Sequence, residues 1–453
     1  MTPRYPGRQD VDPTPLAQPL SFPFSTAVAP NRLMKGAMSE RVCTWDVANP
    51  SKRGAPTEEF LNLYRNWGTG RWGVLLTGNV MIDPAHLEAP GNPAISLEHQ
   101  PVEGDERFET WRRIAAAGKA GGSLLLAQVG HPGRQVVSAI QSDPVSASDV
   151  QLVTDFGGMT FAKPHAATLE EIKKLTEGFV HCAEYLEKAG FDGLQLHGAH
   201  GYLMAQFLSQ TTNKRTDEYG GSLRNRARFI TDVADSIRAR TGPGFVMGIK
   251  INSVEFQESG FTTDEAAELC QLLEEHKFDF VELSGGTYES SGWHHKREST
   301  RAREAFFLDF AEKIVPHVSK TRTYVTGGVR SVGAMVDILQ AGLDGVGIGR
   351  PACAEPRLPK DIFENGVKSC VKPLLDEQDF GLGVAMAGSQ MLQMGHNEEP
   401  MDPSDQKATE GLVKDLTAWK ARVAESKGQL YGFARLESAP VFPYGGNAAP
   451  ARL

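Results

Sequence analysis

Short apolar runs recur along the chain, and each is followed by glycine or a polar residue and then by a longer segment with helical period. Buried parallel strands consist of nearly continuous apolar runs, because helices cover the sheet. The runs expected to be strands are 32–38, 74–80, 123–129, 193–197, 245–252, 280–284, 323–326 and 345–349. Eight strands that alternate with helices predict an α/β fold, a closed (β/α)8 TIM barrel.

The clearest helix is predicted over 168–189. It begins with Thr168 and Glu171, which have the spacing of a capping box, and it stops before Gly190. The alternation of strands and helices ends near residue 359, and a further helix is predicted over 405–427. We therefore expect three parts, which are an N-terminal lead (1–18), a TIM barrel (19–359) and a C-terminal helical extension (360–453).

Several connections are longer than a simple turn between a strand and a helix. They span 83–105, 131–165, 200–224 and 284–303. The loops that follow the strands of a barrel build its active site. We therefore expect the functional residues at the end of the barrel where the strands finish.

Composition and charge narrow the classes of partner. The chain has 453 residues, of which 40% are hydrophobic and 23% charged, and its net charge is −9 without a long run of either sign. This balance argues against nucleic acid as the main partner. No stretch of 18 apolar residues suggests a membrane segment, and the first residues lack an apolar signal core. A cytoplasmic protein that acts on a small molecule is expected.

The five cysteines are widely spaced, and no two of them form a C-x-x-C pair. This arrangement supports neither a disulfide framework nor a zinc or iron–sulfur site. No metal is therefore expected in the protein.

Candidate chemistry begins directly after the fourth predicted strand, where His197, His200 and Tyr202 follow one another in G-L-Q-L-H-G-A-H-G-Y-L. These three side chains can converge if the chain enters a helical turn there. They would then hydrogen-bond one oxygen and deliver one proton. The alternative is that the histidines cap a helix or bind a metal.

Glycine-rich turns follow the last two predicted strands, T-G-G-V-R at 326–330 and G-I-G-R at 347–350. Barrels commonly bind phosphate at this place through backbone amides, and Arg350 can add a bidentate contact. Gln128 and Lys250 lie within apolar strands, where an unpartnered polar group is costly. A structural network could satisfy them, but together with a phosphate site opposite they favour a bound ligand with polar edges.

The run from His197 to Arg226, H-G-A-H-G-Y-L-M-A-Q-F-L-S-Q-T-T-N-K-R-T-D-E-Y-G-G-S-L-R-N-R, strongly resembles the Old Yellow Enzyme family of FMN-dependent NADH:flavin oxidoreductases. Supporting motifs are N-R-L at Asn31, Q-V-G-H-P-G-R at 128–134, I-K-I-N-S in the fifth strand and the terminal G-I-G-R. The similarity covers roughly residues 18 to 357.

The resemblance implies a tightly bound FMN. The residues implied to bind it are Gly36, Ala37, Met38, Ser39, Asn79, Gln128, Lys250, Gly328, Gly349 and Arg350. The first four would lie against the flavin, with Ser39 near its C4 carbonyl, and Asn79 would contact the ring through its backbone. Gln128 would bind the pyrimidine edge, Lys250 would lie near N1 and O2, and the last three residues would hold the phosphate.

The resemblance also implies the reaction. NADH or NADPH would act as a transient hydride donor, and an α,β-unsaturated carbonyl compound would then be reduced in the same pocket by a ping-pong mechanism. His197 and His200 would hold the carbonyl oxygen, and Tyr202 would donate a proton.

Some positions depart from the family pattern. Bacterial relatives often carry Cys at Ser39 and Tyr at Arg41, and the loop 287–304 has no mapped counterpart, so it is either a cap over the pocket or an ordinary surface loop. In many relatives a C-terminal Arg or aromatic residue reaches a neighbouring subunit. Tyr431, Phe433 and Arg435 are the candidates here, and a homo-oligomer is one option for the assembly.

Three other functions are weighed against the ene-reductase. The same flavin could serve an isomerase or a dehydrogenase of natural-product biosynthesis. A non-redox aldolase or isomerase barrel would use Lys250 as a Schiff-base nucleophile and the glycine turns for a substrate phosphate. A protein that only binds ligand is the last alternative.

Overall fold

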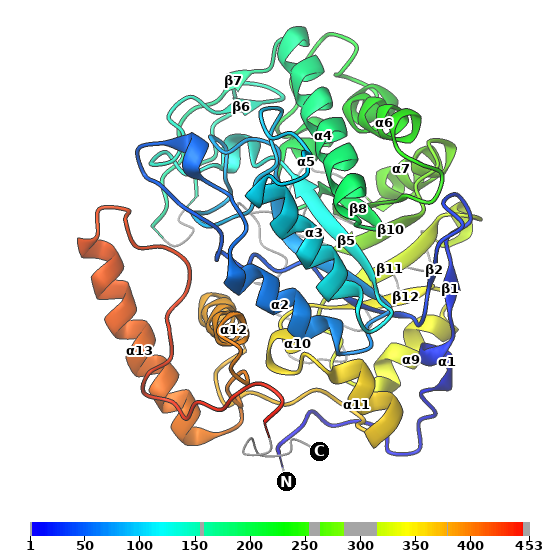
Figure 1. Ribbon diagram of the computed structural model, residues 1–453. Coiled ribbons are helices and arrows are strands. Elements are labelled where there is room, and N and C mark those ends of the chain that lie inside the picture. The colour runs from blue at the N-terminus through cyan, green and yellow to red at the C-terminus, as the bar shows by residue number, and fades with distance from the viewer. Residues whose placement is uncertain (1, 155–157, 253–262, 285–314, 378, 447–453) are drawn as a thin grey trace.

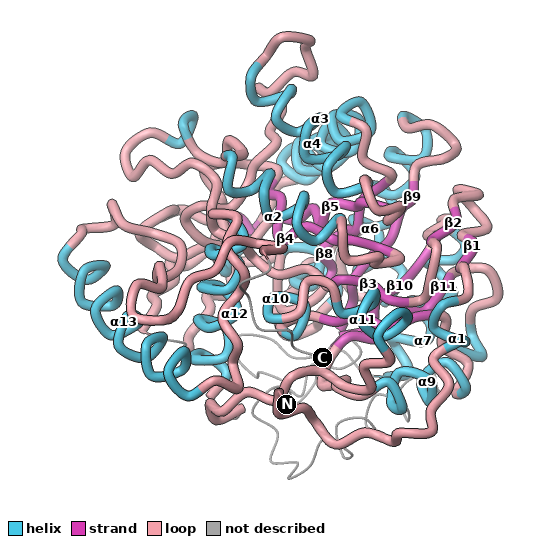
Figure 2. Tube along the Cα trace, turned by 60° about the horizontal axis from the view of Figure 1, so that its bottom comes forward, coloured by secondary structure: helices cyan, strands magenta, loops and turns pink. Residues whose placement is uncertain are grey.

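A computed structural model describes residues 2–154, 158–252, 263–284, 315–377 and 379–446. Eight parallel strands close into a barrel, in the order β10-β11-β12-β3-β4-β5-β8-β9, and helices surround it (Figures 1 and 2). The barrel strands are β3 (Leu33–Lys35), β4 (Val74–Met81), β5 (Leu124–Gly130), β8 (Gly193–Gly198), β9 (Val246–Asn252), β10 (Phe280–Ser284), β11 (Arg322–Thr326) and β12 (Gly345–Ile348). The predicted TIM barrel and its eight strands are confirmed.

The helices follow the strands as the sequence predicts. They are α2 (Glu58–Gly68), α3 (Glu106–Lys119), α4 (Leu169–Ala189), α5 (Leu203–Leu208), α6 (Leu223–Arg240), α7 (Thr263–Glu275), α9 (Val332–Gln340), α10 (Pro351–Ala354), α11 (Leu358–Asn365), α12 (Phe380–Gly395) and α13 (Gln406–Glu425). The capping box of α4 is present, since Thr168 Oγ1 accepts from the Glu171 N–H at 3.1 Å and the Glu171 carboxylate accepts from the Thr168 N–H at 2.8 Å. Gly190 ends this helix at φ 93°.

Alternate residues of each strand point into the barrel. The inward residues at the start of the strands form an apolar cluster: Met34, Val74, Leu76, Leu126, Val246, Phe280 and Tyr324. The hairpin of β1 (Leu20–Ser21) and β2 (Val28–Ala29) adds Leu20 and Ala29 to this cluster. The barrel is therefore packed and closed at this end, which leaves the opposite end for a ligand.

The C-terminal extension lies on one flank of the barrel. Helix α12 packs beside α2, and α13 lies farther out (Figure 1). A small core of its own joins these helices to the chain that follows them: Met386, Met401, Leu412, Leu416 and Leu436. The helix predicted over 405–427 is α13, whereas the division of the chain into three parts stays a prediction. None of the helices in the described ranges has the length and apolarity needed to cross a membrane.

Candidate active site

The three residues predicted after the fourth barrel strand do come together. The ring centroids of His197 and His200 are 5.3 Å apart, and those of His197 and Tyr202 are 4.4 Å apart. A helical turn is not the cause, because α5 begins only at Leu203. Instead, His200 and Gly201 both adopt left-handed conformations, with φ of 57° and 78°. This tight turn brings the second histidine back toward the first.

The left-handed backbone of His200 is held from both sides. Its N–H donates to Asn252 Oδ1 at 3.0 Å, and its carbonyl accepts from Gln135 Nε2 at 3.1 Å. A non-glycine residue in this region is strained, and such strain persists where the surroundings impose it and is concentrated at functional sites. The side chain is oriented as well, since His200 Nε2 lies 2.8 Å from Ser284 Oγ.

Both histidines are uncharged near neutral pH. Burial, with Lys250 as a second cause, lowers the pKa of His200 to about 3. Burial also lowers the pKa of His197 well below its ordinary value, and His200 and Lys250 add to this effect. A neutral imidazole still carries one N–H, so each ring can donate a hydrogen bond to a substrate oxygen.

A chain of polar side chains crosses the interior next to this pair. Gln128 Nε2 donates to Gln195 Oε1 at 2.7 Å, and Gln195 Nε2 donates to Glu282 Oε2 at 2.7 Å. The other carboxylate oxygen of Glu282 lies 3.0 Å from Lys250 Nζ. The sequence interpretation singled out Gln128 and Lys250 but missed Gln195 and Glu282. Both could have been found, because they alternate with apolar residues in G-L-Q-L-H and F-V-E-L-S.

The two glycine turns predicted to hold phosphate lie side by side. β11 pairs with β12 up to Thr326 and Gly347, so the residues that follow both strands emerge together. Gly328 has a φ of 67°, a conformation that glycine adopts without strain. Arg350, directly after Gly349, places its guanidinium 5.6 Å from the ring centroid of Phe380.

The segment after β3 lies beside these turns, because β12 also pairs with β3. The Gly36 N–H donates to the Ile348 carbonyl at 2.8 Å. Ala37, Met38 and Ser39 follow and are each partly exposed. Ser39 Oγ donates to Glu88 at 2.9 Å and accepts from Asn79 Nδ2 at 3.2 Å.

Several buried polar atoms at this end of the barrel find no hydrogen-bond partner within the described residues. They include Asn79 Oδ1, Asn252 Nδ2 and Thr326 Oγ1. A buried polar atom without a partner is costly, so such atoms point to a missing ligand. Together with the donors of Gln128 and Lys250, they fit a planar ring with polar edges such as a flavin.

Two other predicted features concern the loop 287–304 and the C-terminal segment. The loop 287–304 falls outside the described residues. Of the C-terminal candidates, the ring centroid of Phe433 lies 5.3 Å from the Arg41 guanidinium, and Arg435 forms an ion pair with Glu398 at 3.2 Å. These contacts lie within one chain, so they give no support to the predicted reach into a neighbouring subunit.

One group of three potential metal ligands, Asp83, His86 and His131, lies among the described residues, with ligand atoms within 4.8 Å of one another. The Gly133 N–H donates to His131 Nδ1 at 3.0 Å, so this nitrogen carries no proton. The proton of the neutral ring therefore sits on Nε2, which leaves His131 without a lone pair for a metal. Asp83 instead pairs with His86 Nδ1 at 2.8 Å.

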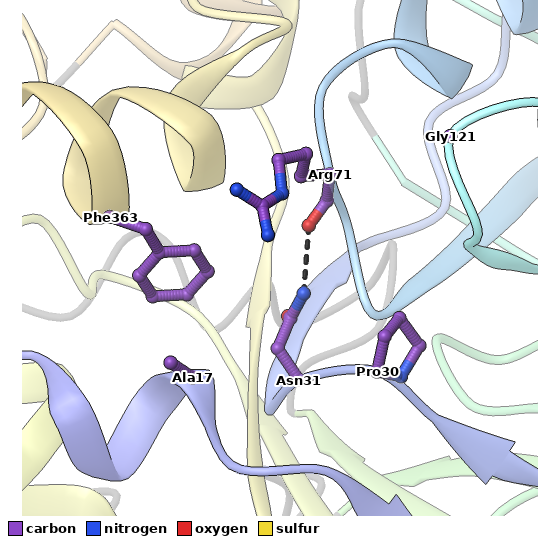
Figure 3. A pocket seen from close by; sticks show the side chains of 6 residues that line it. All are labelled: Ala17, Pro30, Asn31, Arg71, Gly121 and Phe363. Carbon is purple, nitrogen blue, oxygen red and sulfur yellow. Dashed lines mark hydrogen bonds between the residues drawn. The ribbon is translucent and has the colours of Figure 1, made fainter.

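A pocket of about 160 Å³ lies at the opposite end of the barrel (Figure 3). Asn31, Arg71 and Gly121 line it, and each precedes a barrel strand. Asn31 Nδ2 donates to the Arg71 carbonyl at 2.8 Å, which ties two of these segments together. The pocket is smaller than usual ligand sites and has no catalytic group that matches the cluster at the other end.

Comparisons with known proteins agree with this geometry. The NADH-dependent flavin oxidoreductase nadA of Aspergillus parasiticus is 49% identical over 423 residues, which cover 93% of this chain and 95% of that protein. The solved structure of a 2-naphthoyl-CoA reductase complex has a TM-score of 0.69 at 22% identity. This match covers 79% of this chain and 54% of the reductase chain. The Old Yellow Enzyme homologue from Zymomonas mobilis has a TM-score of 0.62 at 23% identity. This match covers 80% of this chain and 96% of the homologue.

The two structural matches have identities below 25% and therefore show the fold alone. The family comes from the sequence, since the model of the NADH:flavin oxidoreductase / NADH oxidase family matches residues 23–368. The predicted cofactors, FMN with NADH or NADPH as the hydride donor, are confirmed at the level of the family. The chain belongs to the NADH:flavin oxidoreductase / NADH oxidase family, the family of Old Yellow Enzyme, and is an FMN-dependent oxidoreductase.

Proposed function

We propose that this oxidoreductase is an ene-reductase, which uses NADH or NADPH to reduce the activated C=C bond of α,β-unsaturated carbonyl compounds. The observation that carries the proposal is the convergence of two neutral histidines and one tyrosine, His197, His200 and Tyr202, at the open end of the barrel. Such a set can bind one carbonyl oxygen and deliver one proton.

Bound FMN would supply the hydride-transfer chemistry. Lys250 and Gln128 would bind the pyrimidine edge of the flavin, where a fixed cation favours the negative charge of the reduced ring. Gly328, Gly349 and Arg350 would hold the phosphate. The segment Gly36, Ala37, Met38 and Ser39 would lie against the ring, with Asn79 beside it.

The histidine pair would polarise the substrate. Two N–H donors directed at one carbonyl oxygen stabilise the negative charge that develops there, and they act more strongly in a buried site than in water. Since the pKa of His200 is lowered to about 3, the pair offers the same two donors across the physiological pH range. The hydrogen bond between His200 and Ser284 helps to fix the orientation of the ring.

Tyr202 would donate the proton to the α-carbon. Its side chain is buried, and its ring lies edge-on to His197. A phenol is a weak acid, but it suffices toward the strongly basic enolate-like carbon that hydride addition leaves.

The two half-reactions test this role separately. In stopped-flow measurements, Tyr202→Phe should leave flavin reduction by NADH unchanged and slow the reoxidation by an activated alkene about 100-fold, as expected for loss of a general acid. Tyr219→Phe is the control, because the Tyr219 hydroxyl donates to Asp232 on α6, and this variant should change neither half-reaction. An equal loss of both half-reactions in Tyr202→Phe would refute the proton-donor role.

The flavin isomerase or dehydrogenase is the second candidate on the same residues. Stoichiometric formation of saturated product for each NADH consumed separates the ene-reductase from this alternative. The family assignment favours both redox functions over the aldolase alternative. Lys250 also has an ion-pair partner in Glu282, which makes it a poor nucleophile.

A further inference from the structure

Glu282 is a buried carboxylate that the proposed reaction does not use. It lies on β10, and its side chain is fully inaccessible to solvent. The register pairs Glu282 with Lys250 on β9, and both point into the barrel. Because a buried carboxylate is unfavourable without a charged partner, this residue needs the lysine.

The carboxylate joins two residues that are proposed to bind the flavin. One of its oxygens lies 3.0 Å from Lys250 Nζ, and the other accepts from Gln195 Nε2 at 2.7 Å. Gln195 in turn accepts from Gln128 Nε2 at 2.7 Å. The orientation of both Gln128 and Lys250 therefore depends on one charged group.

We propose that Glu282 is a positioning residue that sets the reduction potential of the bound flavin through Lys250. This inference rests on the proposed function, because it places the pyrimidine edge of the flavin at Gln128 and Lys250. A lone lysine there would favour the negatively charged reduced flavin. The carboxylate offsets part of that positive charge, so it lowers the potential and makes the reduced flavin a stronger hydride donor toward an alkene.

The direction in which a change at Glu282 shifts the reduction potential follows from electrostatics, because charges in the protein interior are poorly screened. Glu282→Gln keeps the size of the side chain and can still accept from Gln195, but it removes the negative charge. The full charge of Lys250 then acts on the reduced ring, and its effect is stronger inside the protein than at the surface. We expect the equilibrium to shift roughly tenfold toward reduced flavin, which is about 30 mV for a two-electron couple.

The experiment measures the midpoint potential of the FMN-loaded enzyme, by equilibration with a reference dye, for the wild type and three variants. Glu282→Gln should raise the potential, and Glu282→Asp, which keeps the charge, should stay close to the wild type. Asp279→Asn is the matched control, because Asp279 is a second fully buried carboxylate with an ion-pair partner, Arg238 at 2.8 Å, and it lies directly before β10, at the closed end of the barrel. It should shift the equilibrium less than twofold.

The alkene half-reaction gives a second measurement. Glu282→Gln should be reduced by NADH at least as readily as the wild type but should transfer hydride to the alkene more slowly. The inference is overturned if the Glu282→Gln variant binds FMN with a potential equal to or below that of the wild type, or if Asp279→Asn raises the potential as much. A wild-type protein that NADH does not reduce would contradict the proposed function instead, so the two failures are distinguishable.

Discussion

Two lysines are buried in the barrel strands, and they lie on opposite faces of the wall. Lys35 on β3 donates to the Leu76 carbonyl at 2.8 Å, and its Nζ lies 4.1 Å from a ring centroid of Trp67 on α2. Lys250 on β9 points inward and pairs with Glu282. The same residue type in an apolar strand therefore supports packing in one case and faces the ligand end in the other.

The difference comes from the alternation of side chains along a strand. Met34 belongs to the apolar cluster inside the barrel, so its neighbour Lys35 must face the helices outside. There burial lowers the pKa of Lys35, and burial also raises the pKa of Glu40 beside it. The inward lysine instead has an adjacent carboxylate at ion-pair distance. A polar residue in a barrel strand thus indicates a ligand only if its side chain points into the barrel and not toward the surrounding helices.

The largest effect that separates the two lysines should be on FMN binding. Lys250→Met, made together with Glu282→Gln so that no unpaired carboxylate stays buried, should raise the dissociation constant of FMN about 100-fold, because a charge-assisted contact is lost. Fluorescence titration of FMN into the apoprotein measures this constant. A change below threefold would remove Lys250 from the cofactor site.

His200, at the ligand end of the barrel, should also make the free energy of unfolding depend on pH. The folded-state pKa of His200, about 3, lies below the ordinary value near 6.5, so its contribution is fully present above pH 6.5 and is lost as the pH falls toward 3. Between pH 7.5 and pH 5 the wild type should lose about 2 kcal/mol more of its free energy of unfolding than His200→Asn. Urea unfolding at both pH values tests this, and parallel losses in the two proteins would contradict it.

The smallest effect is expected from a change at Lys35, which points toward the helices outside the barrel. Lys35→Met should lower the free energy of unfolding by about 1.5 kcal/mol, since the hydrogen bond to Leu76 is lost while an apolar side chain fills the same space. FMN affinity should stay within twofold of the wild type. If Lys35→Met weakens FMN binding as strongly as the change at Lys250, the distinction between the two faces is wrong.

Much of the fold was predictable from local pattern. Eight apolar runs identified the barrel strands, and the spacing of Thr168, Glu171 and Gly190 identified both ends of α4. The convergence of His197, His200 and Tyr202 was predicted as well, but by a helical turn that the structure does not contain. The left-handed backbone of His200 depends on contacts from Asn252 and Gln135, which lie far away in the sequence.

By itself, the sequence determined the alternation of strands and helices, the family motifs and the identity of the polar residues at the ends of the strands. These are local properties, because they depend on periodicity and on neighbouring residues. Only the tertiary structure decided that Gln195 and Glu282 connect Gln128 to Lys250 and that Lys35 lies outside. Strand register and barrel closure bring these residues together, and both arise from contacts between segments that are distant along the chain.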